Sequence, residues 1–423
     1  MTEVFVTTLN IIYVFLVFAS IYGAFKGNLG LVIFSYLVVS FKTNLLTETG
    51  VADTYFEPQY IIAIIWFVGV LINWSKLNKS KMGYADKSVL ILVIVLFIAQ
   101  TLETVKAINM FNSETEYSVK SFIKQILEIL VLWTSILILP KLQYFEKYLK
   151  NGILWGVAII AMQSFFASDI DGTKYSMDLP ELENRVGGFM KMDLNELTAL
   201  MTIPAYFILI LVLNKRINRL VGIAVLIAIF ISVLFTGSRT GLFAALLSPL
   251  FLIFSPDETN RIKFNFKRFK YVFFSIILVV AGYFILQTYG ETTLQRFSSE
   301  KLDENIRVQR YPEYIYFFSK NPDYLFTGAQ HEITSSLSYK RAAHNFYIQR
   351  VYGFGILYLL FILFLFRRLI KFSNKFIRFP IYIYLFYGLT LSNPPLGYLP
   401  FIVVYFSHYI SIKPLKHKTN VTS

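Results

Sequence analysis

Residues 219–236 read RLVGIAVLIAIFISVLFT, an apolar run whose one charged residue stands at its start. Such a run is close to the ~20 residues that an α-helix needs to cross the hydrocarbon core of a bilayer. The whole chain has the same character, since 56% of its 423 residues are hydrophobic, 17% are aromatic and the mean hydropathy is +0.56. A soluble protein of this composition would have too little polar surface to cover its core. The sequence therefore predicts an all-α integral membrane protein.

Similar apolar runs lie on both sides of this one, separated by polar breaks. Together they predict 12 or 13 membrane spans, at 4–25, 28–42, 58–75, 88–101, 119–140, 151–167, 192–213, 219–236, 239–255, 270–287, 345–366, 378–392 and 397–412. No Lys or Arg precedes the first run, so we expect an uncleaved first span rather than a signal peptide. Residues 1–423 are expected to form a single polytopic transmembrane helical bundle.

The basic residues predict the orientation of the chain. If the spans alternate, the odd-numbered connections and the carboxyl tail share one side, which holds more than half of the 40 Lys and Arg but few of the 26 Asp and Glu. Basic residues collect on the cytoplasmic side of membrane proteins, which puts the amino terminus outside. A short loop at 168–191 and a large loop at 288–343 are then extracytoplasmic. The basic residues are spread over separate segments, so they do not predict a nucleic-acid partner.

Four arginines on the extracytoplasmic side are candidate ligands for a diphosphate or another polyanion: Arg185, Arg239, Arg307 and Arg310. A guanidinium is permanently charged and presents a planar set of donors that fits phosphate oxygens. Arg307 and Arg310 are three residues apart and would share one face of a helix. Pro312 predicts that this helix starts near residue 312, which would put the pair at or just before its amino-terminal end. The alternatives are that Arg239 reaches lipid headgroups and that the pair is solvated surface.

His344 comes directly before the predicted span at 345–366. Histidine has an ordinary pKa near neutral pH, so at the membrane surface beside a diphosphate site it is a candidate general base. A structural histidine is the alternative. The chain has no cysteine, which excludes disulfides and thiolate metal sites, and it has no Walker loop, GxGxxG or HExxH motif. We therefore expect neither a metal nor another cofactor.

Four motifs occur in order in the second half of the chain. They are Arg185-Val186-Gly187-Gly188-Phe189 with Asn195; Gly237-Ser238-Arg239-Thr240-Gly241-Leu242; Arg307 with Tyr311, Asn321-Pro322 and Gly328; and His344-Asn345-Phe346-Tyr347-Ile348-Gln349 with Gly353 and Gly355. Together they resemble the O-antigen ligase/polymerase superfamily, bacterial membrane proteins that transfer glycan from undecaprenyl diphosphate. The resemblance covers residues 185–366, and the first 180 residues match only as generic spans.

The resemblance implies roles for several residues. Arg239 and Arg307 would bind the lipid diphosphate, and His344 would activate the acceptor hydroxyl. Asn345 and Tyr347, which follow the histidine in the fourth motif, would support the site. The reaction of this superfamily is implied to be metal-independent.

The implied activity is a glycan polymerase that joins undecaprenyl-diphosphate-linked oligosaccharide repeats of a capsule, an exopolysaccharide or an O-antigen. An O-antigen ligase, which transfers glycan to lipid A-core, is the alternative, and the loop between Ser298 and Lys340 is expected to choose the acceptor. A flippase is less favoured, because the predicted spans hold few charged residues. Expected partners are the lipid-linked oligosaccharide, membrane lipids, a chain-length regulator and a flippase. The expected location is the bacterial cytoplasmic membrane, with the site on its extracytoplasmic face.

Overall fold

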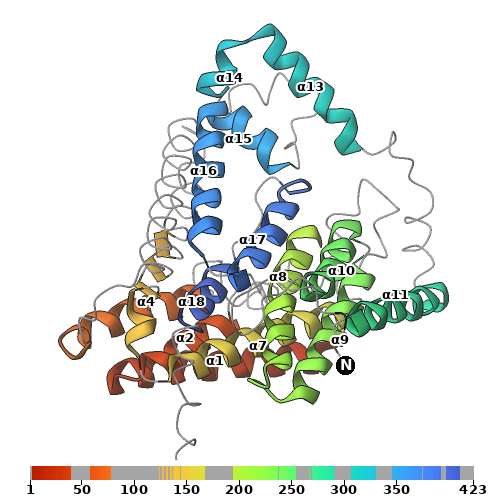
Figure 1. Cartoon of the computed structure of the whole chain (residues 1–423). Coiled ribbons are helices and arrows are strands. Elements are labelled where there is room, and N and C mark those ends of the chain that lie inside the picture. Colours follow the sequence, from red (N-terminus) through yellow and green to blue (C-terminus); the bar gives the residue numbers. More distant parts are fainter. Residues whose placement is uncertain are drawn as a thin grey trace, which may run out of the picture.

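The computed structural model describes residues 2–39, 58–77, 144–166, 194–236, 238–253, 269–289, 306–329, 345–373, 375–391 and 397–409, with Phe266 and parts of 123–142 (Figure 1). All regular secondary structure in these residues is helical, which confirms the all-α prediction. The predicted span at 88–101 lies outside the described residues, and the one at 119–140 is described only in part.

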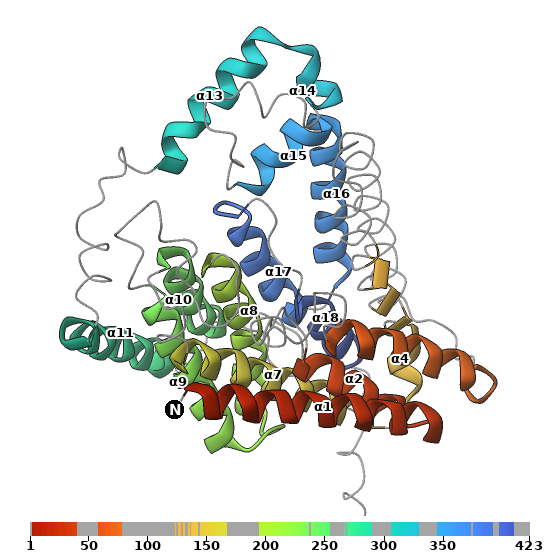
Figure 2. The ribbon, with the colours of Figure 1, turned by 180° about the vertical axis from the view of Figure 1, so that it is seen from behind.

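Three helices lie side by side along one edge of the molecule: α1 (Thr2–Lys26), α2 (Leu29–Val39) and α7 (Phe145–Phe166) (Figure 2). α4 (Pro58–Ile72) packs against α1 and α2, followed by the short helix η1 (Trp74–Lys76), whereas η2 (Leu139–Lys141) precedes α7. The α1–α2 turn uses Gly27 at φ 77°, and Asn73 Nδ2 donates to the carbonyl of Ala24 at 2.9 Å. The turn and the end of α4 are therefore held together.

α8 (Leu194–Leu213) is a central helix, and its residues 197–208 are all buried. It packs against α9 (Arg219–Phe235), which Asn218 caps by accepting from Leu220 N at 2.9 Å, and against α10 (Arg239–Ile253). α11 (Phe269–Tyr289) lies on the flank beside α9 and α10. The predicted spans at 192–213 and 219–236 match α8 and α9 closely.

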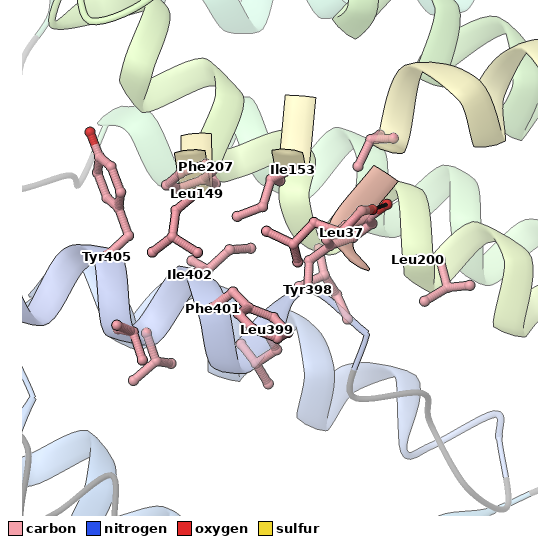
Figure 3. Packing of buried hydrophobic residues seen from close by; sticks show 14 of the residues in the cluster. Leu37, Leu149, Ile153, Leu200, Phe207, Tyr398, Leu399, Phe401, Ile402 and Tyr405 are labelled. Carbon is pink, nitrogen blue, oxygen red and sulfur yellow. Dashed lines mark hydrogen bonds between the residues drawn. The ribbon is translucent and has the colours of Figure 1, made fainter. Parts of the chain in front are cut away.

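Three of the remaining helices form the other end of the molecule. α13 (Ile306–Lys320), α14 (Asp323–Thr327) and α15 (Phe346–Phe354) lie far from α1, and α16 (Ile356–Phe372) and α17 (Lys375–Tyr387) run between (Figure 1). α18 (Leu399–Tyr409) packs against α7 and α8. Its side chains meet Leu37, Ile153 and Phe207 in the hydrophobic core (Figure 3), where the rings of Phe207 and Phe406 are 5.3 Å apart.

Two predictions about this end of the molecule are wrong. The expected single span at 345–366 is divided at Gly355, which has φ 85° and ψ 167°, a conformation nearly confined to glycine. The helix expected to start near Pro312 begins earlier, at Ile306, and contains the proline, although Arg307 and Arg310 do lie at its amino-terminal end as expected. Contacts on both sides of Pro312 hold that helix: Tyr311 bonds to Asn345, and Tyr314 is buried.

Two described helices are long and apolar enough to cross a membrane, Thr7–Lys26 and Asn195–Leu213. Four shorter apolar helices accompany them: Leu29–Val39, Pro58–Ile72, Arg219–Phe235 and Phe376–Tyr387. In the second long helix, 78% of the most apolar stretch is buried inside the protein, as it would also be in the core helix of a soluble protein. By contrast, α1 exposes Phe15, Phe18 and Phe25. These features support association of the chain with a membrane.

A polar cluster joins the start of α7 to the ends of α8 and α18. Arg216 Nη1 lies 3.4 Å from Glu146 Oε1, and Tyr405 OH donates to the same oxygen at 2.9 Å. Lys150 Nζ donates to the carbonyl of Arg216 at 2.7 Å. We call Glu146, Lys150, Arg216 and Tyr405 the basic-end cluster. It brings together the connections at 141–150 and 214–219, which charge counting assigns to the same side.

Candidate functional site

The structure describes part of the predicted site. Arg185 and His344 lie outside the described residues, as do the 168–191 loop and residues 290–305 and 330–343 of the large loop. Arg307 and Arg310 belong to the first two turns of α13, with side chains outside the description. Arg239 and the two supporting residues of the fourth motif are described in full.

The start of α10 is fixed by Ser238, which immediately precedes the helix. Its hydroxyl accepts from the N–H of Gly241, the third helical residue, at 3.0 Å, which is the geometry of an N-cap. The same hydroxyl donates to Asn195 Oδ1 at 2.6 Å, and both side chains are buried. The first helical residue is Arg239, so its backbone is anchored through Ser238 to the start of α8. The first and second motifs are therefore in direct contact.

Gly241 allows α8 and α10 to approach closely. A Cβ at this position would lie 2.6 Å from Thr198 Cβ, 2.7 Å from its Cγ2 and 2.8 Å from its Oγ1. Thr198 is fully buried and bonds to the Asn195 carbonyl at 2.9 Å, so it has no room to move away. The small residue of the second motif thus brings two helix starts together beside Arg239.

The fourth motif builds the start of α15. Asn345 Oδ1 accepts from Tyr347 N at 3.0 Å and Ile348 N at 3.1 Å, so Asn345 caps the helix directly after His344. Its Nδ2 lies 3.3 Å from Tyr311 OH and 3.3 Å from the Leu389 carbonyl, donating to both. Tyr311 belongs to the third motif, four residues after Arg307. The third and fourth motifs are therefore also in contact.

A second contact between these two motifs lies at their glycines. Gly328 and Gly355 have φ of 77° and 85°, and a Cβ on Gly328 would lie 2.5 Å from the Gly353 carbonyl oxygen. A Cβ on Gly355 would collide with the carbonyl of Phe326. Both glycines are therefore required by backbone conformation and by close approach. They join α14 to the end of α15, where Ala329 N also donates to the Tyr352 carbonyl at 2.7 Å.

The two pairs of motifs are linked through the end of α17. Tyr347 OH donates to the Leu385 carbonyl at 2.8 Å, and Phe346 N donates to the Gly388 carbonyl at 2.7 Å. On the other side, Tyr387 OH lies 2.8 Å from Thr202 Oγ1 of α8. The end of α17 therefore contacts both the helix that positions Arg239 and the helix that follows His344.

Sequence reasoning missed three residues of this arrangement: Thr198, Thr202 and Tyr387. A signal for the two threonines was present, because Asn195, Thr198 and Thr202 recur at i, i+3 and i+7 within an apolar span and so form one polar stripe on α8. Tyr387 gave no comparable signal among its aromatic neighbours. Its partner is fixed only by the tertiary fold.

The chemistry available at the first pair of motifs suits an anion. The starts of α8 and α10 meet, and helix starts carry unpaired N–H groups and partial positive charge that favour phosphate. Arg239 adds a full positive charge at the start of α10, and Glu196 adds a negative charge in the first turn of α8. Among the described residues, no group of three or more His, Asp or Glu side chains is arranged to hold a metal ion.

No protein-family model matches the chain, and neither a curated protein nor a solved structure shows significant similarity to it.

Proposed function

We propose that the chain is a membrane glycosyltransferase of the O-antigen ligase/polymerase kind, which joins undecaprenyl-diphosphate-linked oligosaccharide repeats. One observation carries the proposal. The two pairs of neighbouring motifs are in contact, through Ser238 with Asn195 and through Tyr311 with Asn345, and α17 bridges them. Motifs that merely capped separate helices would have no reason to converge in this way.

The reaction needs a nucleophile, a base and a stabilised leaving group. The hydroxyl oxygen of the acceptor unit attacks the anomeric carbon of the donor, while the bond from that carbon to the lipid diphosphate oxygen breaks. His344 takes the proton of the hydroxyl as general base. Arg239, beside the two helix starts, and Arg307, in the first turn of α13, stabilise the charge of the departing diphosphate.

The length of α8 supports a site on one membrane face. Its 20 residues correspond to about 30 Å, which is close to the thickness of the hydrocarbon core. α8 begins beside Arg239 and ends at the basic-end cluster. By the positive-inside rule the basic-end cluster is cytoplasmic, so the proposed site lies at the extracytoplasmic face of a polytopic bundle.

The direct test uses purified protein in detergent with lipid-linked repeats and a metal chelator. Wild-type protein is expected to form polymer, and His344→Ala and Arg239→Ala to lose it while remaining folded. Arg219→Ala is the matched control. Arg219 is also the first residue of an apolar helix, α9, but this helix starts close to the end of α8, whereas Arg239 lies beside the start of α8. Equal rates for wild type and His344→Ala would disprove the catalytic assignment.

A cellular test separates the possible acceptors. Loss of a polymerase leaves single repeats attached to the final acceptor, whereas loss of a ligase leaves long polymer on undecaprenyl diphosphate. We expect the first outcome for a deletion of this chain. The second outcome would assign the same site to ligation.

A further inference from the structure

The end of α17 is in contact with two parts of the proposed site. Toward α15, three backbone carbonyls accept hydrogen bonds from residues of the fourth motif. Leu385 accepts from Tyr347 OH, Gly388 from Phe346 N and Leu389 from Asn345 Nδ2. Toward α8, Tyr387 OH pairs with Thr202 Oγ1 at 2.8 Å. One helical turn therefore faces the start of α15 on one side and the stripe on α8 on the other.

The bond of Tyr387 continues into the polar stripe of α8. Thr202 Oγ1 donates to the Thr198 carbonyl at 2.8 Å, and Thr198 Oγ1 lies 3.4 Å from Ser238 Oγ, which caps the helix of Arg239. Tyr387, Thr198 and Thr202 are each 0% exposed. A connected, buried series of polar groups thus runs from the end of α17 to the residue preceding Arg239.

The surroundings of this series are apolar. Next to it, Tyr206 of α8 packs on Phe379 of α17 with ring centroids 5.4 Å apart. Apolar contact is non-directional and tolerates sliding of one helix along another. A hydrogen bond has a narrow range of distance and angle, and it is stronger in a buried setting than in water. The Tyr387–Thr202 bond therefore sets the register of α17 on α8 more narrowly than the apolar contacts do.

We propose that Tyr387 and Thr202 are positioning residues, whose hydrogen bond sets the separation between the start of α10, with Arg239, and the start of α15, next to His344. Neither residue touches the substrate. The inference rests on the proposed function, because only that function places Arg239 and His344 in one reaction. A misplacement of about 1 Å between reacting groups can cost on the order of 100-fold in rate.

The kinetic test compares Tyr387→Phe, Thr202→Val and the double variant. Each single variant is expected to lower kcat by between about 10- and 100-fold, with a smaller change in KM for the lipid-linked oligosaccharide. The double variant should lose no more than either single variant, because all three lack the same bond. The matched control is Tyr13→Phe, which removes another buried tyrosine hydroxyl, one that accepts from Gln163 Nε2 at 3.1 Å, between α1 and α7. Unchanged kcat in both single variants, or additive losses in the double variant, would overturn the proposal.

A distance measurement separates this proposal from the proposed function. The chain has no cysteine, so Phe243→Cys on α10 and Phe326→Cys on α14, which are 61% and 58% exposed, can carry a unique pair of spin labels. Pulsed electron paramagnetic resonance should give a single distance distribution that Tyr387→Phe shifts or broadens and Tyr13→Phe leaves unchanged. An unchanged distribution in Tyr387→Phe overturns the positioning role. A shifted distribution in a protein that transfers no glycan would overturn the proposed function and leave the positioning of the two helices established.

Discussion

Gly241→Ala tests the closest approach between α8 and α10. The added methyl group would lie 2.6 Å from Thr198 Cβ, whereas carbon atoms in contact are about 3.5 Å apart or more. The two helices must therefore separate by roughly 1 Å, because the Cβ of a buried threonine has no alternative position. Crowding of this kind costs about 1–3 kcal/mol, against a gain of about 1 kcal/mol from replacing glycine by alanine in a helix.

We therefore expect Gly241→Ala to destabilise the protein by up to about 2 kcal/mol and to lower glycan transfer, since Arg239 moves with α10. Gly353→Ala is the matched control. Gly353 belongs to the fourth motif, but a Cβ there meets nothing within 4 Å, so this change should stabilise α15 by up to about 1 kcal/mol and preserve activity. Thermal unfolding of both variants in detergent measures the difference in their stability. If Gly241→Ala were as stable and as active as Gly353→Ala, the close approach of α8 and α10 would be wrong.

Substitutions at three further positions test the helix starts and the break between α15 and α16. Ser238→Ala removes the cap of α10 and the buried hydrogen bond from Ser238 Oγ to Asn195 Oδ1, so unfolding experiments should show a loss of about 1–2 kcal/mol; an unchanged Tm would contradict the cap. Asn345→Ala should cost about 1 kcal/mol, and Asn345→Asp should recover the cap but not the bond to the Leu389 carbonyl, which needs an N–H donor, giving intermediate stability in the same assay. Equal stability of Asn345→Ala and Asn345→Asp would show that the cap contributes nothing measurable and would contradict this prediction. Gly355→Ala combines a positive φ with a collision against Phe326 and should be the least stable of these variants, with reduced yield of folded protein; wild-type yield and Tm would contradict it.

The apolar runs of the chain predicted several helices well. α8 and α9 begin and end within two residues of the predicted spans, because charged residues such as Asp193 and Arg219 bound predominantly apolar runs. Hydropathy carries this information locally, one helix at a time. It carries none about which helix starts meet, so the contact between Asn195 and Ser238 required the tertiary structure.

The break at Gly355 shows what hydropathy overlooks. Residues 351–366 stay apolar through the break, so the sequence reads as one span. Gly353 and Gly355 belong to the fourth motif, but the sequence does not say why glycine is needed there. The reason is the close approach of Phe326 and Gly328, which lie in a separate segment and meet them only in the folded protein. The start of α13 was mistaken for a related reason, since the contacts that hold it lie on α15.

The most direct test of the proposed function is the stoichiometry of transfer by the purified protein. Lipid-linked repeats are incubated with the enzyme, and the undecaprenyl diphosphate released is counted against the glycosidic bonds formed. The proposed reaction predicts one diphosphate carrier released for each new bond, with both quantities lost together in His344→Ala. Absence of new glycosidic bonds from the wild-type protein, or bond formation that does not depend on His344, would contradict it.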